Sequence, residues 1–245
     1  MNNPKERSVE FPKQSADHDI MAILDGRKTQ LRLQLNPHPP KEFCQGDVAA
    51  ITNGNRWAIG RSAFSQLGRG AWPPDPYPGL LCPNGKPGDR LWVRESHAFS
   101  VIDPEGFDWR EDPDNWDVVY RADTSREGLN WRNAAGEVIP PPWRRSIHMP
   151  RWASRILLEI TDVRVERLQD ISDKDALAEG IEIVGGETSC EPYRNYRAQK
   201  GMKGRNCSSP YASFQTLWTA INGDPSWLKN PWVWVVEFKR LETSQ

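Results

Sequence analysis

The sequence has few cysteines and no long apolar run. Its 245 residues include only four cysteines, Cys44, Cys82, Cys190 and Cys207. No two of them have the spacing of a metal-binding pair, and no apolar leader precedes them, so the sequence predicts thiols in a reducing cytoplasm rather than a secreted disulfide framework. No stretch approaches the roughly 18 apolar residues of a transmembrane helix, and we expect no membrane partner.

The chain also lacks an excess of charge of either sign. Its formal net charge is −1, so any nucleic-acid binding must use a local basic patch. No P-loop, dinucleotide-binding glycine motif or Ser-His-Asp order is present. His97 and His148 are too far from any matching Cys or Asp pattern to indicate a metal. We therefore predict neither a metal nor a cofactor.

Proline and tryptophan, in contrast, are abundant, with 21 and 12 copies. Proline interrupts helices and sheet ladders, which predicts short strands and long ordered loops. Tryptophan faces either pack in a core or stack on other rings. An apolar fraction of 37% is enough for an ordinary core.

Hydrophobic periodicity predicts a mixture of strands and short helices. Helices are expected at 20–26, capped by Asp17 or Asp19, at 170–181, capped by Ser172, and at 211–221. Strands are expected at 29–35, 47–51, 56–64, 91–95, 116–122, 155–168 and 231–241, with a bend near Thr161. The connections are too tight or too irregular for repeated βαβ units. We therefore predict an α+β fold, a small, mixed, partly open β-barrel with short helices at its ends.

The segment ILDGRKTQLRLQL combines a basic turn with an alternating strand. Leu31, Leu33 and Leu35 are expected on one face, and Arg32 on the other. Arg27, Lys28 and Arg32 form a local basic patch. It either contacts phosphates or is a solvated strand face.

Four segments in this order, ILDGRKTQ, KPGDRLWVRE, RILLEITDVRVERLQDISDKDALAEGI and PWVWVVEFKRL, resemble the ASCH domain family of PUA-like β-barrels. The longer pattern, with SIHMPRWASRI, looks like the bacteriophage and prophage subgroup. The resemblance covers about half of the chain. It implies one PUA-like domain over 17–241, with insertions at about 36–84, 97–149 and 185–210. Residues 1–16 are expected to be a mobile arm and 242–245 a tail.

The resemblance implies a ligand cleft beside the barrel. One ASCH branch is similar to N4-acetylcytidine amidohydrolases, in which a lysine base, a threonine nucleophile and a glutamate acid act together. The lysine falls on Lys28 and the glutamate on Glu179, but the nucleophile position falls on Leu31. Thr29 is two residues away, which displaces its hydroxyl by roughly 6–7 Å along a strand. Lys28 and Glu179 form either a functional pair or a structural salt bridge.

Other residues are candidates for the same ligand. Glu95 should point inward from its strand, and it either lines the cleft or pairs with an arginine. Trp92 and Arg94 share the opposite face, and Trp92 and Trp152 are candidates for stacking on a base. A polar segment from residue 193 onward is either a basic flap over nucleic acid or a solvated loop. Its cations are Arg194, Arg197, Lys200, Lys203 and Arg205.

The sequence thus predicts recognition of RNA, nucleic acid or a modified nucleoside, in a bacterial host cytoplasm if the chain is phage-encoded. Two alternatives remain open at this point. One is an enzyme, an amidohydrolase on N-acylated cytidine-like nucleosides or a nuclease, that uses Lys28, Glu179 and Thr29. The other is a phage protein–protein module that binds a host protein.

Overall fold

A five-stranded mixed sheet organises the protein. The computed structural model describes residues 4–36, 48–53, 56–61, 81–101, 116–127, 141–185, 190, 192–198 and 206–242. The strand order is β1-β5-β8-β9-β2, and only β1 and β5 pair in parallel. The bounds are Glu6–Val9 (β1), Gln30–Gln34 (β2), Arg90–Val93 (β5), Leu157–Arg167 (β8) and Trp232–Leu241 (β9). The α+β class is confirmed, and within the described residues the sheet is open, with β1 and β2 at its edges.

Both faces of the sheet are covered, which gives the domain two apolar cores. Helix α1 (Ala16–Leu24) packs Ile20 and Ile23 into the larger core, against alternate residues of β8 and β9. The opposite residues of β9, Val233 and Val235, contact the second core under three helices. These are α3 (Asp173–Ala178), α4 (Pro210–Asn222) and α5 (Asp224–Leu228). Burial on both sides fits the nearly all-apolar sequence of this strand, which is typical of a central strand.

Strand β8 contains one extra residue. Its register with β9 shifts between Ile160 and Asp162, which leaves Thr161 unpaired and exposed. Ile160 faces the larger core before this bulge and Val163 after it. Even-numbered residues therefore face the larger core before Thr161, and odd-numbered residues after it. The predicted bend near Thr161 is confirmed.

The segment interpreted as a mobile arm needs correction. Residues 6–9 are an edge strand of the sheet, and Val9 and Phe11 are buried in the larger core. Helix α1 also begins earlier than predicted, at Ala16, so Ser15 precedes it, and Asp17 and Asp19 lie inside its first turn. A short, polar edge strand is hard to predict from local sequence, because the strand with which it pairs lies far away in the chain.

The segments interpreted as insertions contain regular structure where they are described. The strands predicted at 47–51 and 56–64 are present as β3 (Val48–Asn53) and β4 (Arg56–Arg61), which pair antiparallel. β6 (His97–Val101) pairs with β7 (Trp116–Tyr120), and α2 (Arg121–Glu127) follows directly. Single 3₁₀ turns lie at Ser146–His148 (η4), Arg151–Ala153 (η5) and Leu168–Asp170 (η6). Because Ala122 of α2 joins the larger core, part of 97–149 is integral to the domain.

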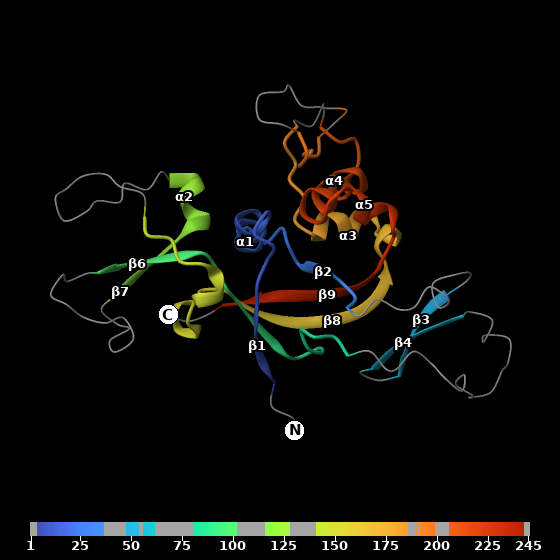
Figure 1. Ribbon diagram of the computed structural model, residues 1–245, viewed down its shortest axis with the longest axis horizontal. Coiled ribbons are helices and arrows are strands. Elements are labelled where there is room, and N and C mark those ends of the chain that lie inside the picture. Colours follow the sequence, from blue (N-terminus) through green and yellow to red (C-terminus); the bar gives the residue numbers. More distant parts are fainter. Residues whose placement is uncertain are drawn as a thin grey trace.

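Two groups of elements lie at opposite ends of β8 and β9 (Figure 1). Helices α3, α4 and α5 gather near one end, and β6, β7 and α2 near the other. Cys82, Cys190 and Cys207 carry thiols rather than disulfides, whereas Cys44 lies outside the described residues. No helix in the described part of the chain has the length and apolarity needed to cross a membrane.

Candidate functional site: a buried charge network beside a surface pocket

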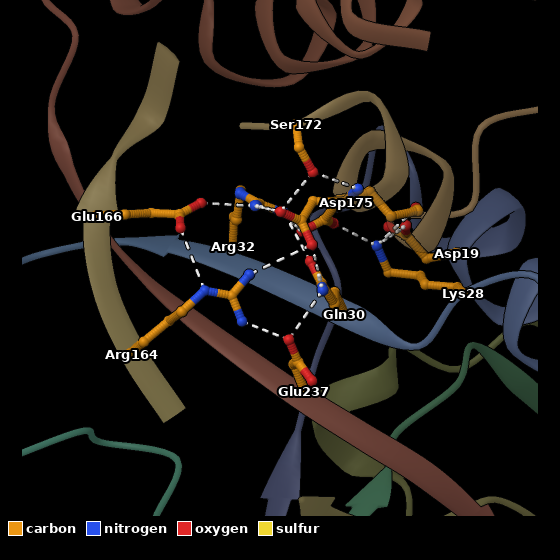
Figure 2. Close-up of polar contacts among 10 residues, drawn as sticks. Asp19, Lys28, Gln30, Arg32, Arg164, Glu166, Ser172, Asp175 and Glu237 are labelled. Atoms are coloured by element: carbon orange, nitrogen blue, oxygen red, sulfur yellow. Dashed lines mark hydrogen bonds and ion pairs between the residues drawn. The ribbon is translucent and has the colours of Figure 1, made fainter. Parts of the chain in front are cut away.

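Strand register gathers a set of charged side chains on the face of the sheet that α3, α4 and α5 cover. Arg32 of β2 and Arg164 of β8 both pair with Val235 of β9, and Gln30 pairs with Glu237. Because alternate residues of a strand share a face, Gln30, Arg32, Arg164 and Glu237 all point to the same side. Helix α3 closes over them. Figure 2 shows the resulting charge network, whose members are Asp19, Lys28, Gln30, Arg32, Arg164, Glu166, Ser172, Asp175, Glu179 and Glu237.

Arg32 lies at the centre of this network, with only 1% of its side chain exposed. Its Nη1 donates to Glu179 Oε1 at 2.9 Å and to Gln30 Oε1 at 3.0 Å. Its Nη2 donates to Glu166 Oε1 at 2.6 Å. Its guanidinium carbon also lies 5.8 Å from the centre of the Phe214 ring. The cation is therefore held on several sides by carboxylates and an aromatic ring.

Lys28 is equally buried, with 3% of its side chain exposed. Its Nζ contacts Glu179 Oε2 at 2.8 Å, the Glu179 carbonyl at 3.0 Å and Asp19 Oδ1 at 3.2 Å. Glu179 thus bridges Lys28 and Arg32, one cation on each oxygen. All three donor positions of the ammonium group have an acceptor, which is the condition for burying it at tolerable cost.

Helix α3 and the residue that ends it supply two of the carboxylates, Asp175 and Glu179. Ser172 caps the helix by accepting from the Asp175 backbone N–H, as predicted, and its hydroxyl donates to Asp175 Oδ2 at 2.8 Å. Asp175 Oδ1 accepts from Gln30 at 2.8 Å. Gly180 ends this segment with φ at +90°, and a Cβ there would come within 2.8 Å of the Ala22 Cβ. Only glycine fits both the backbone and the close approach to α1.

The pKa directions follow from this geometry. Burial alone lowers the pKa of Lys28, but the charges of Asp19 and Glu179 outweigh it and raise the pKa above its ordinary value. Burial likewise raises the pKa of Asp19, and the nearby Lys28 charge reverses the shift, so that the pKa is lowered. Both groups are therefore charged at neutral pH. Lys28 is in the wrong protonation state for a general base.

These contacts correct the interpretation of the basic turn. Lys28 and Arg32 are neither phosphate ligands at a surface nor a solvated strand face, because both are buried and paired with carboxylates. Of the three predicted cations, only Arg27 keeps an exposed side chain, at 35%. The network has three cations, Lys28, Arg32 and Arg164, against five carboxylates.

The covalent chemistry implied by the family resemblance lacks its nucleophile in this geometry. Leu31 is buried in the larger core, and Thr29 is exposed on the side opposite the buried Lys28. The hydroxyl of Ser15 donates to the Pro12 carbonyl at 3.4 Å, and Ser15 is itself only 3% exposed. Lys28 and Glu179 are brought together as predicted, in the form of a salt bridge.

A surface pocket of about 480 Å³ borders the network where α3 ends. Leu177, Ala178, Ile181 and Ile183 supply apolar walls, and Arg27 and Glu182 supply opposite charges. Arg27 is held in place by donation from its Nη1 to the Gly180 carbonyl at 2.8 Å. Glu182 is contacted by Arg194 Nη1 at 2.5 Å and by His18 Nε2 at 3.5 Å. This volume is in the range that small-molecule sites occupy, about 300–1,000 Å³.

Glu95 is not part of this pocket. Its side chain is buried and receives a two-pronged contact from Arg155, at 3.1 Å and 2.8 Å. Arg155 also contacts Asp123 of α2 and lies over the Tyr120 ring at 3.9 Å. Of the two predicted roles of Glu95, the structure therefore has the pairing with an arginine. Burial raises the pKa of Glu95, and Arg155 only partly opposes this.

Trp92, Arg94 and Trp152 do not converge on the pocket either. Trp92 pairs with Leu157 of β8, about seven positions along that strand from Arg164, which corresponds to roughly 20 Å at about 3.3 Å per residue. The Arg94 guanidinium lies over the Trp92 ring at 4.9 Å. Trp152 stacks on Phe99, with ring centres 5.4 Å apart. The residues predicted to line one cleft therefore lie in two separate parts of the structure.

The predicted basic flap is only partly described. Arg194 pairs with Glu182 and Arg197 with Asp224, so a carboxylate faces each of these two cations. Lys200, Lys203 and Arg205 lie outside the described residues.

The sequence interpretation missed most of the acidic partners, namely Asp19, Glu166, Asp175, Glu182 and Glu237. A signal was present for one of them, because Glu166, like Arg164, alternates along β8 with residues of the larger core. No group of three or more His, Cys, Asp or Glu in the described part of the chain is arranged to hold a metal ion.

Comparisons of the chain with protein-family models, with curated proteins and with solved structures found no match.

Proposed function

We propose that the protein binds a nucleobase or nucleoside, free or within RNA, in the pocket between Arg27 and Glu182. The observation that carries the proposal is the combination of apolar walls with two opposite charges at the edge of one pocket. A base has apolar faces and a polar edge that carries both donors and acceptors. Leu177 and Ile183 would contact the faces, and the charged pair would bind the edge.

The two charges favour a neutral ligand with mixed polarity. The carboxylate of Glu182 can accept from an exocyclic amine, as carboxylates do from cytosine. The guanidinium of Arg27 can donate to a ring or carbonyl acceptor. A simple anion would be repelled by Glu182, and a simple cation by Arg27. Cytidine-like bases, which present an amine beside a ring nitrogen and a carbonyl, suit this pair.

The family resemblance supports the same class of ligand. The segments shared with the ASCH domain family include both the turn that carries Arg27 and the end of α3, and PUA-like domains bind RNA or modified bases. We extend the proposal to a PUA-like ASCH domain of the bacteriophage type in a bacterial cytoplasm. Recognition is favoured over amide hydrolysis, because Lys28 is protonated and fully paired and Leu31 occupies the nucleophile position.

Calorimetric titration with cytidine and N4-acetylcytidine tests the proposal. Glu182→Gln removes the charge that accepts from the exocyclic amine, and a hydrogen bond to a charged group is worth about 1.5–3 kcal/mol. We expect the affinity for cytidine to fall roughly tenfold or more. Arg27→Ala should weaken both nucleosides.

Arg90→Ala is the matched control for Arg27→Ala, because Arg90 is an exposed arginine on β5, outside the pocket. It should leave both affinities unchanged. The proposal is wrong if the unmodified protein binds neither nucleoside, or if Glu182→Gln and Arg27→Ala bind as tightly as the unmodified protein. Mass spectrometry of the N4-acetylcytidine mixture adds an independent readout, since a cytidine product would favour the amidohydrolase.

A further inference from the structure

A second surface, far from the pocket, combines arginines with an exposed tryptophan. It surrounds η4 and η5, near the end of the sheet where β6 and β7 lie (Figure 1). Trp152 is 41% exposed, although one of its faces packs on Phe99. We call this the Arg–Trp surface, and its members are Trp92, Arg94, Arg144, Arg145, Arg151 and Trp152.

Contacts join these residues into two groups, which meet where Arg151 and Trp152 follow each other in the chain. Arg94 and Arg151 lie over the Trp92 ring at 4.9 Å and 5.9 Å. Arg144 lies over the Phe99 ring at 5.5 Å, and Phe99 supports Trp152. Cations stacked on rings are held with their planes parallel to the aromatic surface. These contacts place Arg94 and Arg151 beside Trp92, and Arg144 beside the ring that supports the exposed Trp152.

The sequence around η4 and η5 is rich in positive charge, although the whole chain is nearly neutral. Residues 138–158 contain four arginines and no Asp or Glu. Arg151 contacts Glu6 at 2.6 Å, and Arg94 contacts Glu10 at 3.2 Å. Both carboxylates are partly exposed, at 42% and 37%, so these pairs contribute little to stability and are open to exchange. Arg145 is exposed and has no ion pair among the described residues.

We propose that the Arg–Trp surface binds single-stranded nucleic acid. An unpaired base would stack on Trp152, and its flanking phosphates would contact Arg144, Arg145 and Arg151. An exposed ring beside positive charge is the usual platform for such strands. An acidic peptide would use the arginines but would have no need of the indole. The inference does not rest on the proposed pocket, which shares no residue with this surface.

The test is fluorescence anisotropy with labelled 12-residue oligo(U) and oligo(dT). Trp152→Ala should weaken binding about 5- to 100-fold, whereas Trp152→Phe, which keeps a ring, should stay within roughly fivefold of the unmodified protein. Arg145→Ala should weaken binding of both oligomers and lower the slope of log affinity against log salt by about 1. Glu6→Gln should strengthen binding, because it frees Arg151.

Lys229→Ala is the control for charge, since Lys229 is an exposed cation at the end of α5, outside the Arg–Trp surface. It should bind like the unmodified protein. Thermal unfolding of each variant verifies that the fold is kept. The proposal is overturned if the unmodified protein fails to bind either oligomer at low salt. It is also overturned if Trp152→Ala binds normally, or if poly-glutamate binds as tightly with the same response to every variant.

Discussion

Replacing Glu179 by alanine should lower the free energy of unfolding by about 3–5 kcal/mol. This carboxylate bridges Lys28 and Arg32, both buried, and its loss leaves each cation with fewer counter-charges than burial requires. The cost comes from uncompensated buried charge rather than from the intrinsic strength of either contact. Urea unfolding at pH 7, with the slope compared between variants, measures the change.

Two further variants make this test specific. Asp170→Ala removes an exposed carboxylate close to α3 and should change stability by no more than about 0.5 kcal/mol. Lys28→Met combined with Glu179→Ala should cost less than the sum of the two single changes, by about 0.5–3 kcal/mol. If Glu179→Ala costs under about 1 kcal/mol, the network is solvated and its residues are not coupled.

The same network limits the pH range over which the protein keeps its full free energy of unfolding. The lowered pKa of Asp19 contributes stability that is present above the ordinary value of 3.8 and is lost as pH falls through the folded value below it. The raised pKa of Lys28 contributes stability that is present below 10.5 and is lost as pH rises through the folded value above it. Between these limits the contribution of the network is constant.

Replacing Arg155 by methionine should cost about 3–5 kcal/mol at pH 7.5, and less at pH 5. Arg155 is the cation that holds the buried Glu95 carboxylate with two contacts. Burial already raises the pKa of Glu95 above 4.5, and loss of Arg155 raises it further. A raised acid pKa gives stability that is fully present below the unfolded value and is lost as pH rises through the folded one. The deficit of the variant should therefore shrink on acidification.

Urea unfolding at both pH values measures this difference. Arg197→Met is the matched control, because Arg197 is half-exposed and pairs with the exposed Asp224, so its loss should cost about 0–1 kcal/mol. Adding Glu95→Gln to Arg155→Met should recover stability at pH 7.5. A deficit that is the same at both pH values would instead assign Arg155 a packing role over the Tyr120 ring.

The strands and helices with strong periodicity were predictable from local sequence. The last strand, the bend at Thr161 and the Ser172 cap all follow from patterns within one segment. The burial of Arg32 did not, because an alternating strand with a polar face normally borders solvent. Its cover, α3, comes from a segment about 140 residues later in the chain. Strand β1 was missed for the same reason, since its partner is β5.

The same distinction between local and long-range determinants applies to the candidate sites. The pairing of Lys28 with Glu179 was predicted through the family resemblance, and the arginine partner of Glu95 through the cost of an unpaired buried charge. The carboxylate charges that keep Lys28 a cation despite its burial include Asp19 of α1, which local sequence did not connect to it. The separation of Trp152 from the pocket depends on the length of β8.

The bulge in β8 places one residue outside the pairing that the rest of the strand keeps with β9. Thr161 is unpaired and exposed, so many side chains fit there. Deleting the residue would remove the bulge and leave the facing of Asp162 to Arg167 unchanged, because Ile160 and Asp162 pair with Phe238 and Glu237, which are consecutive in β9. Natural relatives of this chain should therefore vary in sequence at this position, and some should lack the residue altogether.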